Sequence, residues 1–213
     1  MRNKPLLEEK GRAKEEEYFR RRDAELLRES KRKQEALEEH EHIKRETGIT
    51  DDEVVAELKA DGYDRETIRL LHLAPLIQVA WAHGNKVPVE ERCHILEAAK
   101  MHGVAPGSRA HERLTSWLEV RPSDQFFRKS LRAIRAILHS LEPEHREIRK
   151  LDLLALCTKV AQASGGFFGL GSRISAREKA LLAEITAELE RTHGDAAARM
   201  AARMQREWTP PAN

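Results

Sequence analysis

The sequence predicts an all-α protein: a compact helical bundle with an internal pseudo-twofold repeat, preceded by a long charged N-terminal helix. Charged residues make up 35% of the 213 residues and aromatic residues only 5%. That balance favours helices over sheets, because strands depend on aromatic and β-branched side chains. No stretch alternates apolar and polar residues for long enough to predict a strand. Apolar residues instead recur at helical spacing, as in Phe127, Leu131, Ile134 and Leu138.

Residues 1–46 carry 14 Lys or Arg and 13 Asp or Glu, interleaved along the segment. This pattern predicts one long, extended helix with many ion pairs between residues four apart. Its apolar residues are few: Leu7, Phe19, Leu26, Leu37 and Ile43. Their spacing mixes seven and eleven residues, so two interpretations stay open: a solvated helix that seeks a protein partner, or a coiled-coil homodimer.

Residues 47–73 are expected to form a small helical hairpin. Gly48 ends the first helix, and Thr50 with Glu53 predicts a capping box at the start of the next one. Gly62 turns the chain, and Asp64 is expected to cap a further short helix that runs to His72.

The main bundle is predicted at residues 74–192. Pro75 is suited to the first turn of a helix, Pro122 and Pro143 interrupt helices, and Asp124 and Ser175 are candidate caps. We expect helices near residues 75–83, 88–102, 108–120, 124–141, 144–164, 175–192 and 195–207. Residues 193–213 would form a C-terminal helix and a disordered tail.

Two segments of the bundle resemble each other: VAWAHGNKVPVEERCHIL (79–96) and VAQASGGFFGLGSRISAREKALL (160–182). Each predicts a helix that ends in small residues and a glycine, then a turn, then a second helix with a glutamate near its start. Glycine suits the helix end because that position often needs a positive φ. The glycine-rich loop at 163–173 is therefore interpreted as an inter-helix connection. It lacks the lysine and the preceding strand of a phosphate-binding loop.

This doubled arrangement resembles the TerB-like domain of the tellurite-resistance proteins, over roughly residues 74–192. The resemblance implies a compact helical bundle with pseudo-twofold symmetry. It also implies a non-enzymatic module in membrane-associated stress-response complexes, with metal or small-ion binding proposed for the family.

The family motif is usually Ala-Asp-Gly followed by a glutamate in each copy. Only the glutamates carry over, as Glu91 and Glu178, while His83 and Ser164 occupy the aspartate positions. Because Ca²⁺ takes six to eight oxygen ligands, the missing aspartates remove half of the carboxylates that the motif implies. The candidate metal ligands are Glu91, Glu178 and His83.

Each candidate ligand also has a structural explanation. Ser175 and Glu178 have capping-box spacing, and Glu91 follows Pro88 at a helix start, where a carboxylate favours the helix dipole. His83 could cap a helix or lie at the surface. No cofactor follows from these residues, and a divalent metal ion remains the alternative.

No catalytic machinery is predicted. The sequence lacks His-Glu-x-x-His and Cys-x-x-Cys motifs, and no Ser/His/Asp arrangement can be assigned. Cys157 is expected to pack in an apolar helix, and Cys93 lies among charged residues. The charged N-terminus, the absence of a long apolar run and the two cysteines predict a cytoplasmic protein.

Two further features predict contact surfaces. Phe167, Phe168 and Leu170 lie in the glycine-rich loop, which either folds back over the bundle or docks a protein partner or a membrane surface. Arg128, Arg132 and Arg135 share one helix face, either as a solvated stripe or as a surface for nucleic acid or an acidic partner. A net charge of +2 and the absence of interleaved aromatic residues disfavour nucleic acid.

The sequence thus predicts a non-catalytic TerB-like adaptor in a stress-response or envelope-associated assembly. Its protein partners would bind the N-terminal helix and the Phe167–Leu170 loop. The alternatives are a metal-binding or metal-sensing bundle and a nucleic-acid binder.

Overall fold

The computed structural model describes residues 4–82, 84–163 and 174–191, with side chains from Glu17 onward. Within these ranges the chain is helical and has no strand, which confirms the predicted all-α class. The elements are α1 (Lys4–Thr47), α2 (Asp52–Ala60), the 3₁₀ helix η1 (Ile68–Leu73), α3 (Ala74–Ala80), α4 (Val89–Met101), α5 (Arg109–Glu119), α6 (Asp124–Ser140), α7 (Pro143–Ala163) and α8 (Ala176–Glu190).

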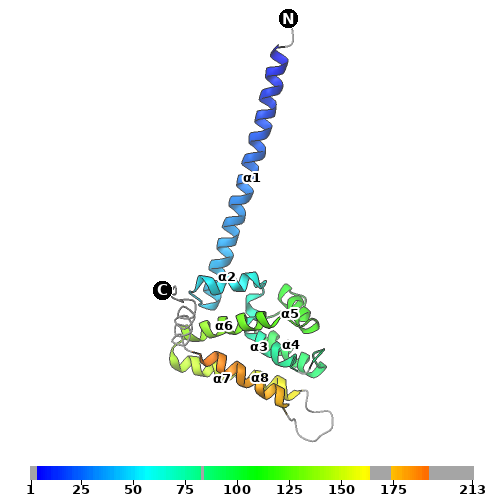
Figure 1. Ribbon diagram of the computed structural model, residues 1–213, viewed down its shortest axis with the longest axis vertical. Coiled ribbons are helices and arrows are strands. Elements are labelled where there is room, and N and C mark those ends of the chain that lie inside the picture. Colours follow the sequence, from blue (N-terminus) through cyan, green and yellow to red (C-terminus); the bar gives the residue numbers. More distant parts are fainter. Residues whose placement is uncertain (1–3, 83, 164–173, 192–213) are drawn as a thin grey trace, which may run out of the picture.

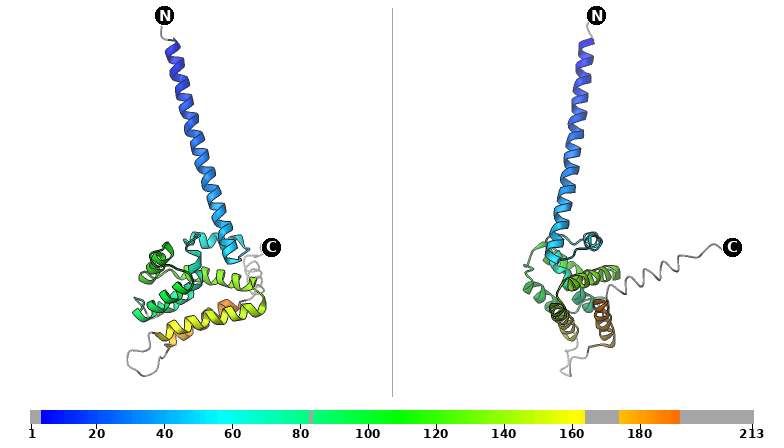
Figure 2. Two further views of the ribbon diagram at one scale, coloured as in Figure 1. Left: turned by 180° about the vertical axis from the view of Figure 1, so that it is seen from behind. Right: turned by 90° about the vertical axis from the view of Figure 1, so that its left-hand side faces the viewer.

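The molecule has two parts of different character, a compact bundle and a single long helix. Figure 1 shows that α1 projects from the bundle formed by the other helices, and the views in Figure 2 show the same projection from two further sides. At 44 residues, α1 is about 66 Å long, from a rise of 1.5 Å per residue. The predicted long N-terminal helix is confirmed.

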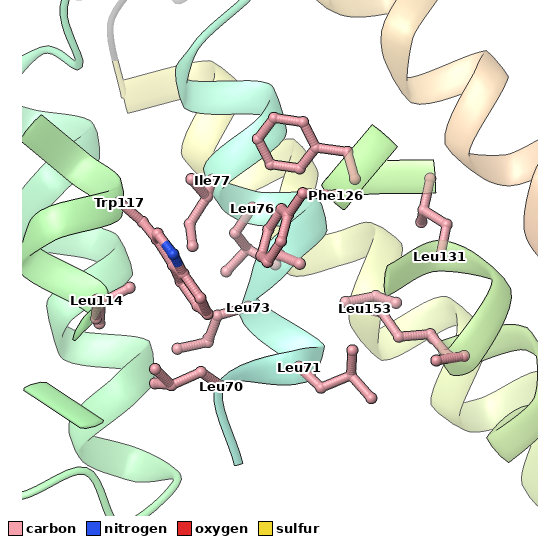
Figure 3. Packing of buried hydrophobic residues seen from close by; sticks show 14 of the residues in the cluster. Leu70, Leu71, Leu73, Leu76, Ile77, Leu114, Trp117, Phe126, Leu131 and Leu153 are labelled. Carbon is pink, nitrogen blue, oxygen red and sulfur yellow. The ribbon is translucent and has the colours of Figure 1, made fainter. Parts of the chain in front are cut away.

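The core of the bundle centres on η1 and α3. Leu70, Leu73, Leu76 and Ile77 are each fully buried, and Figure 3 shows them between Leu114 and Trp117 of α5 on one side and Leu131 and Leu153 on the other. α3 and its neighbour η1 are therefore covered from several sides by the amphipathic helices around them.

The expected hairpin at 47–73 belongs to this same core. Val54, Val55 and Leu58 of α2 and Tyr63 of the following turn are buried in the one cluster that also contains η1 and α3. The hydroxyls of Tyr63 and Ser130 are 3.2 Å apart and hydrogen-bonded across the interior. Residues 47–73 thus contribute side chains to the same core as the rest of the bundle.

Three local expectations need correction. Asp51, rather than Thr50, caps α2, because its carboxylate accepts the amides of Glu53 and Val54. Ser123, rather than Asp124, caps α6 by accepting the amide of Phe126. Asp64 does not cap the short helix that follows it: η1 is a 3₁₀ helix whose N-cap residue is Thr67, and Asp64 lies in the turn before it. Thr67 donates its hydroxyl to Asp64, whose carboxylate also accepts the amides of residues 66 and 67.

Two other expectations about helix ends are confirmed, and one is not. Gly48 follows α1 directly with φ of 71°, a conformation that L side chains rarely adopt. Gly84 does not end its helix as expected, because α3 ends at Ala80, with Trp81 as the C-cap residue, and Gly84, with φ of 135°, lies in the turn beyond it. Ser175 caps α8 in a complete capping box with Glu178. The predicted helix at 195–207 lies outside the described residues.

Candidate functional site

The clearest candidate for an interaction site is the exposed length of α1. Every side chain from Glu17 to Glu38 is exposed. This length includes the large apolar side chains Tyr18, Phe19, Leu26, Leu27 and Leu37, each more than half exposed. Large apolar side chains gathered on one exposed segment commonly mark a protein interaction site.

The exposed apolar set on α1 differs from the set that the sequence predicts: it has two further members, and one predicted member is buried. Tyr18 and Leu27 extend the predicted set, and each stands beside an already named residue, Phe19 or Leu26. The two adjacent pairs, spaced eight residues apart, were the available signal. Ile43, by contrast, is fully buried, because it lies where α1 enters the bundle.

Charges on the exposed part of α1 pair mainly within the helix. Arg21 pairs with Glu17 and Lys33 with Glu29, both at a spacing of four residues. The predicted intrahelical ion pairs are therefore present. Such exposed pairs contribute only a few tenths of a kcal/mol each, so they support the helix without tying it to the bundle.

The base of α1 is fixed to the bundle by contacts with α2. The ammonium of Lys59 donates to the carbonyl of Ala36 at 2.8 Å, and Lys44 donates to Asp52 at 2.9 Å. His40 lies 2.9 Å from the same Asp52 oxygen. Hydrogen bonds from His40 and Lys44 lower the pKa of the Asp52 carboxyl. These contacts set the direction in which α1 leaves the bundle.

Glu91 and Glu178 occupy equivalent positions in the two predicted copies, each as the third residue of its helix. Both are almost completely buried, at 0% and 1% exposure. Glu178 accepts the amide of Ser175 at 2.7 Å in the capping box. The residue before α4 is Pro88, and no side chain there caps the helix. Since Pro88 has no amide hydrogen, Glu91 cannot complete the same capping box.

Other parts of the candidate metal site and contact loop lie outside the described residues. These parts are His83 of the candidate metal site and Phe167, Phe168 and Leu170 of the contact loop. Within the described ranges, no group of three or more His, Cys, Asp or Glu side chains is arranged to hold a metal ion.

Cys157 is buried, as expected, and burial raises the pKa of its thiol to about 12.

Of the three arginines predicted to share one face of α6, two form ion pairs with other helices. Arg132 of α6 contacts both carboxylate oxygens of Glu57 in α2 at 3.1 and 3.2 Å. Arg135 pairs with Glu188 of α8, while Arg128 is exposed. Two of these three guanidinium groups are therefore paired with carboxylates of other helices, which reduces the free positive charge of this face.

Comparison with known proteins finds no relative of this chain. A scan against protein-family models gives no match for this chain, and searches of curated proteins and of solved structures give none either. Among the described helices, none combines the length and apolar character needed to cross a membrane.

Proposed function

We propose that this chain is a non-catalytic adaptor whose α1 binds a protein partner. The observation that carries the proposal is the set of five large apolar side chains exposed on α1 between Tyr18 and Leu37. Removing such side chains from water on binding is worth about 25 cal/mol per Å² of apolar surface. The bundle would serve as the rigid base from which this helix is presented.

The TerB-like resemblance supports the wider setting of this proposal. It rests on the doubled helix-glycine-helix pattern, and the structure adds that both corresponding glutamates are buried at helix starts. On that basis we assign the adaptor to a stress-response or envelope-associated assembly in the cytoplasm. The Phe167–Leu170 loop is a second proposed contact, for a protein partner or a membrane surface.

The α1 proposal is tested with the triple variant Phe19→Glu/Leu26→Glu/Leu37→Glu in the full chain. All three positions are more than half exposed, so the bundle should stay folded. Wild type and variant are used as baits for partner capture in cells, followed by quantitative mass spectrometry. The triple variant should lose the specific partners, by at least tenfold in recovery.

The matched control is Met101→Glu/Leu151→Glu, which changes apolar side chains that are 71% and 61% exposed on the bundle. It should retain the wild-type partners. Equal recovery by the triple variant would refute the proposal. Light scattering of the purified wild type and triple variant then tests for self-association: a dimer that only wild type forms means that α1 binds a second copy of this chain.

A divalent cation site is the second candidate, because Glu91 and Glu178 are 0% and 1% exposed at helix starts that correspond in the two predicted copies. Calorimetric titration of the full chain with Ca²⁺, Mn²⁺ and Zn²⁺ tests this function. Saturable heat that disappears in Glu91→Gln/Glu178→Gln would support it. An absence of heat and of any thermal shift with all three ions would exclude it.

A further inference from the structure

A mostly apolar groove lies on the bundle, away from the exposed part of α1. It has a volume of about 650 Å³ and is lined by residues from the end of α1, the segment leading into η1, η1 itself, α6 and α7, together with His102 after α4. Its size falls within the range of small-molecule sites, which measure roughly 300–1,000 Å³. Its aliphatic lining includes Ile134, Leu138 and Leu153, together with Ile137, Leu141 and Leu156.

The aliphatic lining is not sealed from solvent. Ile137, Leu141 and Leu156 are only half-buried, although they pack against the core. An apolar chain laid along them would have its methylene groups removed from water, which favours binding. The groove is therefore suited to an extended hydrocarbon.

Guanidinium groups border the same groove. Arg65, Arg69 and Arg149 all line it. Arg69 donates to the carbonyl of Gly103 at 3.1 Å, whereas Arg65 and Arg149 are exposed and have no ion pair within the described part of the chain. The carboxylates of Glu46 and Asp152 also line the groove, so the three arginines leave its fixed charge positive.

An unsatisfied polar atom marks one part of the lining. His72 and His102 both line the groove, with ring centroids 3.9 Å apart. The Nε2 atom of His72 is buried and has no hydrogen-bond partner among the described residues. A buried polar nitrogen without a partner is costly, and a ligand oxygen that reached it would remove that cost.

We propose that this groove binds an anionic amphiphile, specifically a medium- or long-chain fatty acid. The aliphatic lining would hold the hydrocarbon chain, and Arg65 or Arg149 would bind the carboxylate through charge-assisted hydrogen bonds. This site is independent of the adaptor role assigned to α1, since the two share no exposed apolar side chain.

The test is calorimetric titration of the full chain with decanoate below its micelle concentration. Wild type should bind one decanoate per chain. Decyltrimethylammonium, with the same chain and the opposite charge, should bind at least tenfold more weakly. No saturable binding of decanoate, or equal binding of the two amphiphiles, would overturn the proposal.

Two variants locate the site. Arg65→Gln/Arg149→Gln should weaken decanoate binding at least fivefold, while Arg128→Gln, an exposed arginine of α6 outside the groove, should not. Ile137→Trp should fill the groove and abolish binding, with circular dichroism as the check on folding. Unchanged affinity in the double arginine variant would place any bound fatty acid elsewhere and refute the assignment.

Discussion

α1 and α6 are both rich in charged residues, but they use their charges differently. Arg21 and Glu17 pair within α1, with side chains 79% and 58% exposed. Arg135 of α6 pairs with Glu188 of another helix, with side chains 18% and 23% exposed. The first ion pair lies on the surface of a solvated helix, and the second joins two helices of the bundle.

The apolar face of each helix explains this difference. α6 buries Phe126, Phe127, Leu131, Ile134 and Leu138 on one side, which brings its arginines next to α2 and α8. In α1, the apolar side chains from Tyr18 to Leu37 are all exposed. Charge composition alone therefore does not distinguish a core helix from a projecting one, whereas the density of the apolar stripe does.

Truncation of a phenylalanine should show the largest difference between α6 and α1. Phe127 is 1% exposed and Phe19 is 61% exposed. Phe127→Ala should lower the free energy of unfolding by about 3–5 kcal/mol, because it leaves a cavity in the core. Phe19→Ala should change it by less than about 0.5 kcal/mol. Denaturant unfolding measures both values, and similar losses would contradict the assignment of α1 as a projecting helix.

Acidification should affect the bundle next most strongly. Burial and the neighbouring His102 lower the pKa of His72 to about 3, below its ordinary value of 6.5. Between about pH 6.5 and 3, the imidazole of His72 therefore binds a proton in the unfolded chain but not in the folded chain. The free energy of unfolding falls as the pH drops through this range. The contribution of His72 to this slope is up to about 1.4 kcal/mol per pH unit.

Unfolding measured at pH 7, 6, 5 and 4 tests this dependence. His72→Leu should have a flatter profile than wild type over that range. His145→Leu, which removes an exposed histidine of α7, is the matched control and should keep the wild-type slope. Identical slopes for wild type and His72→Leu would show that the imidazole is not held neutral by burial.

The smallest expected difference concerns the ion pairs themselves. Arg135→Gln should destabilise the bundle by about 1 kcal/mol, because the pair with Glu188 is partly shielded from water. Arg21→Gln should cost no more than about 0.3 kcal/mol. A double-mutant cycle with Glu188→Gln gives the coupling energy of the Arg135 pair, and a value near zero would remove the contrast between the two kinds of pair.

Helix positions could largely be predicted from the sequence, because proline, glycine and capping residues act locally. The expected helix at 124–141, for example, is α6 at Asp124–Ser140. The individual cap was harder to assign, since Thr50 and Asp51, or Ser123 and Asp124, are adjacent residues that can each accept amide hydrogen bonds. Only the backbone conformation decides between such neighbours.

Tertiary relations could not be predicted in the same way. Nothing local to Arg132 indicates that Glu57, 75 residues away, is its partner. The full burial of Glu91 also goes against the usual behaviour of glutamate, because its environment depends on how the helices pack around the start of α4. The groove is formed by residues from separate parts of the chain, and no short sequence pattern describes it.

The rigid continuity of α1 fixes both the reach and the rotational phase of its exposed side chains. Phe19 lies 24 residues before Ile43, the buried residue at the base, and so stands about 36 Å from it along the helix axis. Loss of a single residue between them would shorten that reach by only about 1.5 Å but would turn Phe19 by about 100° around the axis. A partner that contacts both α1 and the bundle would therefore be affected much more by the rotation of Phe19 around the helix axis than by the small change in the length of α1.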